Sequence, residues 1–102
     1  MFIVIYRFEV VQGLAKEFEQ EWEELTFAFI NYANGLGSRL HKDAHENYIA
    51  YAQWPDERSW NEAGAKLPES AQKLSAQMRS RCSKFEVLHT LYEVKNLLKT
   101  EN

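Results

Sequence analysis

Every second residue is apolar over positions 2–11, and over positions 14–33 large apolar residues recur at every third or fourth position. The first spacing predicts a strand, and the second predicts an amphipathic helix. Gly13 separates the two segments, and Asn34-Gly35 is a strong signal for the end of a helix. The fold therefore begins with a strand that leads into a long helix.

The remainder of the chain predicts three more strands and two shorter helices. The expected elements are strands at 37–42 and 47–54 joined by a hairpin at 43–46, a helix from Glu57 that Gly64 and Pro68 break, a helix from Glu69 to Arg81, and a strand at 84–94. The order β-α-β-β-α-β predicts a ferredoxin-like α+β fold, with an antiparallel sheet and helices on one face. Residues 1–94 are expected to form this domain, and residues 95–102 a short polar tail.

Helices on one face leave the opposite face of the sheet uncovered. That face is expected to carry Ile3 and Ile5, together with Ile49 and Tyr51 or Leu88 and Tyr92, depending on the strand register. An apolar patch of this kind on a small domain usually marks an interface, so we expect a homodimer with its two sheets packed face to face. Arg7 and Glu9 lie on the same face, where His41 or a symmetry mate is expected to pair with them.

Charge is low overall but unevenly distributed. Lys and Arg number 12 against 15 Asp and Glu, a net charge of −3. A protein that binds a phosphate backbone is normally basic, so no nucleic-acid partner is expected. Residues 14–33 carry five Glu against one Lys, whereas residues 66–84 carry five basic residues against one Glu. These two segments are expected to form complementary neighbouring surfaces.

Two further features exclude other classes of protein. The single cysteine excludes an intrachain disulfide and a cysteine-based zinc cluster. The apolar N-terminal run is interrupted by Arg7 and Glu9, well short of a signal-peptide core or a membrane span. We therefore expect a cytoplasmic protein with no membrane partner.

Several motifs together resemble the antibiotic biosynthesis monooxygenase domain. They are the spacing Gly13…Phe18…Trp22, the stretch from Gly37 to Lys42, the strand from Tyr48 to Trp54 with Pro55 after it, and Trp60. The similarity covers about residues 1–92 and implies a dimeric α+β barrel with a pocket in each protomer between sheet and helices. Characterised relatives include oxygenases that oxidise polycyclic phenols to quinones without metal or flavin. The resemblance thus implies a monooxygenase-like protein that acts on a small aromatic or quinol substrate and needs no cofactor.

The same family includes proteins that bind and degrade haem, with an Asn on the first strand, a Trp on the helix after the third strand, and a His ligand. The matching positions here hold Tyr6, Ala63 and a residue near Lys73, and no His lies between residues 46 and 88. Haem degradation by that route is not expected. The main alternative to an enzyme is a dimeric module that binds a small molecule without reaction, with haem binding as a third possibility.

Five residues are candidates for the pocket, each with a structural alternative. Tyr6 is expected to point toward the helices, where its phenol either holds a substrate oxygen, as a catalytic group, or completes the core. Trp22, Trp54 and Trp60 either line a slot for a flat aromatic ligand or fill the core. His89 is either the general base of a pocket at its strand or an interior histidine.

No metal site and no cysteine nucleophile are expected. His41, Asp43 and His45 are residue types that ligate divalent metals, but two His and one Asp near a turn are common by chance. Cys82 follows Arg81, whose charge would lower the pKa of an exposed thiol. No histidine is near it in sequence to support nucleophilic catalysis.

Overall fold

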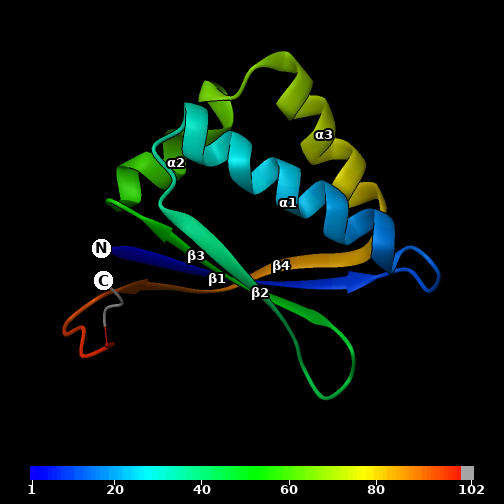
Figure 1. Ribbon diagram of the computed structural model, residues 1–102, viewed down its shortest axis with the longest axis horizontal. Helices are drawn as coiled ribbons and strands as arrows, with labels where there is room; N and C mark the ends of the chain where they lie inside the picture. The colour runs from blue at the N-terminus through cyan, green and yellow to red at the C-terminus, as the bar shows by residue number, and fades with distance from the viewer. Residues whose placement is uncertain (100–102) are drawn as a thin grey trace.

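A computed structural model describes residues 1–99 and shows a single antiparallel sheet with helices packed on one of its faces (Figure 1). The strands are β1 (Phe2–Val10), β2 (Gly37–Lys42), β3 (Tyr48–Trp54) and β4 (Cys82–Tyr92), in the spatial order β2-β3-β1-β4. The helices are α1 (Ala15–Tyr32), α2 (Glu57–Lys66) and α3 (Glu69–Ser80). The ferredoxin-like α+β fold predicted from the sequence is therefore confirmed. Positions 100–102 of the expected tail lie outside the described residues.

The end of α2 differs from the expectation. The side chain of Asp56 caps the helix by accepting a hydrogen bond from the backbone N–H of Ser59 over 2.7 Å. Gly64 was expected to break α2 but lies within it, because an interior glycine costs only about 1 kcal/mol relative to alanine. The helix ends at Lys66. Leu67 is extended because the ring of Pro68 disfavours helical backbone angles in the residue before it.

The helices cover the face of β1 that carries its alternate apolar residues. Val4 and Phe18 are fully buried there. The buried residues form two clusters, one around Phe8 and Phe18 and one around Phe2 and Val4. Tyr6 and the α1 residue Phe29 pack against both clusters, so they lie at the boundary between the two halves of the core.

A β-bulge changes which residues of β4 face the helices. Ile5 pairs with His89 and Tyr6 pairs with Val87, so Leu88 has no partner on β1. Directly paired residues of neighbouring strands share a face. His89 therefore lies on the face of Ile5, away from the helices. Its expected interior position is wrong, because the extra residue reverses the alternation of β4.

The register also decides the two alternatives for the uncovered face. Ile5 pairs with Tyr51, which places Tyr51 on the uncovered face along with Ile49. Tyr92 pairs with Phe2 instead and contacts its ring edge-on, at a centroid distance of 5.2 Å on the helix side.

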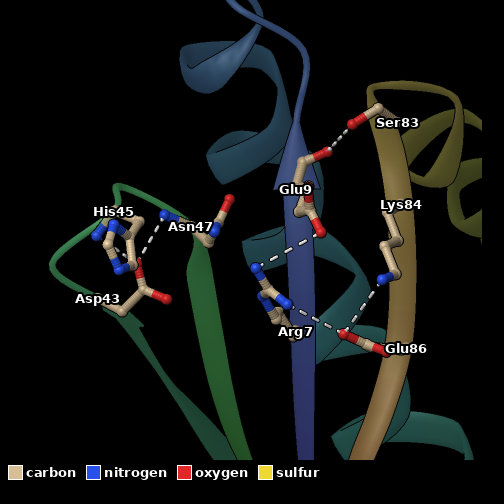
Figure 2. A network of polar contacts seen from close by, with 8 residues as sticks. All are labelled: Arg7, Glu9, Asp43, His45, Asn47, Ser83, Lys84 and Glu86. Atoms are coloured by element: carbon tan, nitrogen blue, oxygen red, sulfur yellow. Dashed lines mark hydrogen bonds and ion pairs between the residues drawn. The ribbon is translucent and has the colours of Figure 1, made fainter.

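Arg7 forms its ion pairs within the chain. Its guanidinium lies 3.3 Å from Glu86 of β4 and 3.5 Å from Glu9, and Figure 2 shows Lys84 approaching the same Glu86 carboxylate. The expected partner His41 instead places its Nδ1 atom 3.2 Å from the carbonyl oxygen of Ile49. The charges of these four side chains on the uncovered face are thus balanced within one protomer.

Candidate functional site

Two adjoining cavities lie between the sheet and the helices. The first, here called the inner cavity, has a volume of about 100 Å³ and lies among α1, α3, β3 and β2. The second, here called the outer hollow, has a volume of about 540 Å³ and is lined by α2, α3 and β4. Both are lined by Tyr6, Phe29, Trp54, Ser75, Arg79 and Phe85. These six residues form the shared wall, which is the candidate site.

Tyr6 and Trp60 are joined by a hydrogen bond across the outer hollow. The indole Nε1–H of Trp60 on α2 donates to the hydroxyl oxygen of Tyr6 on β1 over 2.7 Å. Burial raises the pKa of Tyr6, offset in part by this hydrogen bond and by the charge of Arg79. Tyr6 therefore stays a neutral phenol near pH 7. Its own proton meets no acceptor among residues 1–99, so it is available to a bound molecule.

Arg79 brings a positive charge to the shared wall. Its guanidinium carbon lies 4.7 Å from the centroid of the Phe85 ring, a cation–π contact. Within the described part of the chain, no carboxylate pairs with Arg79, and no other charged side chain lines either cavity. Arg81, by contrast, makes two 3.0 Å hydrogen bonds to the carboxylate of Glu21. That pair joins the acidic segment 14–33 to the basic segment 66–84, which were expected to form neighbouring surfaces.

Trp54 also has an unused hydrogen-bond donor. Its ring is 4% exposed and lines both cavities, and its Nε1–H has no acceptor among residues 1–99. Phe29 meets this ring edge-on, with centroids 5.5 Å apart. A buried donor without an acceptor costs roughly 1–3 kcal/mol. An acceptor on a bound molecule would recover part of that cost.

The structure brings together only some of the residues expected in the pocket. Tyr6, Trp54 and Trp60 all line the outer hollow, whereas Trp22 lines the inner cavity and not the outer hollow. His89 lines neither cavity, because the bulge at Leu88 places it on the opposite face of the sheet.

Arg79 was not among the residues predicted for the pocket. Its signal is a row of polar residues, Gln72, Ser75 and Arg79, which lies at helical spacing beside the apolar row of α3. All three of these residues line the outer hollow. The sequence alone does not distinguish this row from an ordinary solvent-exposed helix face. The structure does, because Arg81 pairs with Glu21 whereas Arg79 has no carboxylate partner among residues 1–99.

The hairpin is closed by its own hydrogen bonds, and the thiol of Cys82 is partly buried. The carboxylate of Asp43 accepts hydrogen bonds from the backbone N–H groups of His45 and Asn47, which closes the loop (Figure 2). Residues 1–99 contain no group of three or more His, Cys, Asp or Glu side chains placed to hold a metal ion. Burial raises the pKa of the Cys82 thiol, opposite to the direction expected from the charge of Arg81.

Comparisons with known proteins agree with the fold. The family model for antibiotic biosynthesis monooxygenases matches residues 1–65. SnoaB, a cofactor-independent oxygenase from Streptomyces nogalater, superposes with a TM-score of 0.75 at 19% identity, over 96% of this chain and 97% of that chain. PA3566 from Pseudomonas aeruginosa has a TM-score of 0.71 at 20% identity, over 92% and 94% of the two chains.

A conserved protein from Methanosarcina mazei has a TM-score of 0.74 at 12% identity, over 91% of this chain and 92% of that chain. Identities this low support the fold and not a shared reaction. No curated protein matches the sequence significantly. Among the described residues, no helix is long and apolar enough to cross a membrane. Since the family model covers well over half of its length, the chain belongs to the antibiotic biosynthesis monooxygenase family.

Proposed function

We propose that this protein is a cofactor-independent oxygenase that binds a planar phenolic molecule, such as a quinol, in the outer hollow. One observation carries the proposal: a neutral phenol donor, Tyr6, and an unpaired cation, Arg79, line the same aromatic-walled space. Small-molecule sites span about 300–1,000 Å³, and the outer hollow lies within that range at about 540 Å³.

The walls of the outer hollow suit a flat ring. Phe29, Trp54, Trp60 and Phe85 all contribute aromatic surface. Stacked and edge-to-face contacts stabilise aromatic pairs beyond the burial of their area. A planar aromatic molecule therefore gains more from this hollow than an aliphatic molecule of equal size does.

The polar groups favour the ionised form of a phenol. The positive charge of Arg79 lowers the pKa of a nearby acid, and the hydroxyl of Tyr6 donates a hydrogen bond that is stronger to a phenolate than to a phenol. Trp60 fixes the orientation of Tyr6 through the 2.7 Å hydrogen bond. A phenolate is electron-rich, and this is the form of the substrate that can pass electrons to dioxygen.

The overall reaction needs no external reductant. One atom of dioxygen enters the ring as a new carbonyl oxygen, and the other leaves as water with two hydrogens of the substrate. The C–H and O–H bonds of the phenol break, a C=O bond forms, and the substrate supplies all four electrons that dioxygen accepts. Neither cavity is lined by a carboxylate or a histidine within residues 1–99, so water at the open side of the hollow takes the phenol proton.

The proposal includes a homodimer formed through the uncovered face of the sheet. Leu91 of β4 is 45% exposed and pairs with Ile3 on this face. An exposed apolar residue on the same face as Ile5 and Tyr51 supports a symmetric contact. Sedimentation analysis at micromolar concentration tests this, and a monomer mass would overturn it.

The test of function is oxygen uptake with a panel of quinols and polyphenols. With ¹⁸O₂, the proposal expects one labelled oxygen in the product and one in water. Uptake by wild type that falls in the Trp60→Phe variant supports an oxygenase. Saturable quenching of tryptophan fluorescence without any uptake would instead identify the module that binds without reaction.

A further inference from the structure

The inner cavity exists because β3 carries two small residues where its neighbours are large. Tyr48, Ala50, Ala52 and Trp54 alternate along β3 and are all buried under the helices. Ala50 and Ala52 line the inner cavity, and neither lines the outer hollow. The inner cavity therefore occupies the volume that larger side chains at these two positions would fill.

The free hydrogen-bond donors of the inner cavity described above lie in the shared wall. Outside that wall, the hydroxyl of Thr26 donates to the carbonyl oxygen of Trp22 over 2.9 Å, and the backbone carbonyl oxygen of Gln53 accepts from the N–H of Leu36 over 2.9 Å. Ser38, which pairs with one of the alanines in the register, adds a single hydroxyl. A buried water needs about two to four polar partners, more than this one hydroxyl supplies. The part of the cavity next to the alanines is thus suited to a dry apolar guest.

The size of the cavity limits that guest. An engineered apolar cavity of about 150 Å³ stays dry and binds benzene or xenon. The inner cavity is smaller, at about 100 Å³, so a multi-ring substrate does not fit. A diatomic gas molecule or a xenon atom does fit.

The inner cavity adjoins the outer hollow through the shared wall, which includes Tyr6 and Trp54. Its lining also includes Ile30 and Gly35, where α1 leads into β2, and neither of these two residues lines the outer hollow. A gas molecule in the inner cavity would therefore lie beside the phenol site, in a space that the bound ring does not occupy.

We propose that the inner cavity is a binding site for dioxygen, held next to the ring in the outer hollow. The dioxygen assignment rests on the proposed oxygenase function. Gas binding itself rests on the cavity alone.

Xenon is the probe for gas binding. Crystals of the full chain pressurised with xenon are expected to show xenon beside Ala50 and Ala52. The Ala52→Val and Ala50→Val variants fill the cavity with a residue type that strands tolerate well, and xenon should be lost from both. Gly64→Ala is the matched control, because its new methyl group meets nothing within 4 Å and lies on the outer hollow only. Circular dichroism confirms that each variant is folded.

Two outcomes overturn gas binding: no xenon in wild type, or ordered water in the inner cavity. The kinetic test then varies dioxygen at saturating phenol. The filled variants should lower kcat/KM for dioxygen about tenfold, with the Kd of the phenol unchanged. An unchanged dioxygen dependence in a folded variant would overturn the dioxygen assignment. If no phenol supports any uptake while xenon binds, the oxygenase proposal fails and the gas site stands.

Discussion

The indole N–H of Trp60 on α2 donates a 2.7 Å hydrogen bond to the hydroxyl of Tyr6 on the central strand β1. The two residues are 54 positions apart, and α2 also meets the sheet through the Phe2–Trp60 ring contact and the hydrogen bond that Tyr92 donates to Glu57. The Trp60–Tyr6 bond therefore helps to hold α2 in place and orients the Tyr6 hydroxyl.

Removal of this bond should affect stability and turnover together. Trp60→Phe is expected to lower the free energy of unfolding by about 1 kcal/mol, the usual worth of one hydrogen bond, beyond any packing loss. Urea unfolding of Trp60→Phe, Tyr6→Phe and the double variant measures the coupling. A coupling near zero would contradict the bond, since two side chains in contact should not be additive.

Arg79 should matter for ligand binding and little for folding. Arg79→Gln is expected to weaken binding of an ionised phenol roughly tenfold, or ~1.4 kcal/mol, and to leave stability within about 0.5 kcal/mol. Fluorescence titrations above and below the pKa of the phenol measure this effect. The control is Lys73→Gln on the same helix. The Lys73 side chain is 77% exposed, and its ammonium lies 3.4 Å from the carboxylate of Glu69. Equal losses in both variants would argue against a specific role for Arg79.

The Glu21–Arg81 pair should be a main link between α1 and the end of α3. Glu21 is 7% exposed and accepts both guanidinium hydrogen bonds. Glu21→Ala is expected to cost about 2 kcal/mol, in the range for hydrogen bonds to charged groups. Urea unfolding at pH 7 provides the measurement. Glu17→Ala, an exposed change in the first turn of the same helix, should cost much less.

Tyr48 should make stability fall in alkaline solution. Burial and the hydrogen bond that Tyr48 donates to Glu19 raise the pKa of Tyr48 to about 12, from 10.0 for an ordinary tyrosine. Between these values the unfolded chain loses a proton that the folded chain keeps, so stability declines as pH rises. The decline attributable to Tyr48 is roughly 3 kcal/mol in total. Unfolding of wild type and Tyr48→Phe from pH 8 to 11.5 should show a shallower decline in the variant.

The pH profile of turnover should reflect the substrate rather than a base of the protein. Because no carboxylate or histidine of the described residues lines the outer hollow, kcat/KM should rise with pH up to the pKa of the phenol itself. A series of phenols with different pKa values should shift the profile in step. His89→Gln should leave it unchanged, since His89 is paired with Ile5 on the other face. A fixed inflexion that disappears in His89→Gln would restore His89 as the base.

Most of the fold could be predicted from the sequence because its strands and helices differ clearly in the spacing of their apolar residues. Which residues of β4 face the helices could not be predicted beyond Val87. The bulged residue Leu88 is apolar, so the sequence gives no sign that the alternation changes there. Trp60 and Tyr6 could be expected near the pocket, but their hydrogen bond depends on where α2 packs. From the sequence alone, Arg79 could not be distinguished from the other basic residues of its segment. The structure makes the distinction, because Arg81 pairs with Glu21.

The position of β4 beside β1 has a consequence for synthesis of the protein. The N–H of Glu93 donates to the carbonyl oxygen of Met1 over 3.0 Å, so the two ends of the domain meet at one edge of the central strand. A ribosome must release residues 82–92 before β1 gains its second neighbour, and contacts so distant in sequence slow folding. Until then one side of β1 offers unpaired backbone groups to other chains. The nascent protein thus passes through a stage in which it is open to aggregation and lacks Phe85, one wall of its own ligand site.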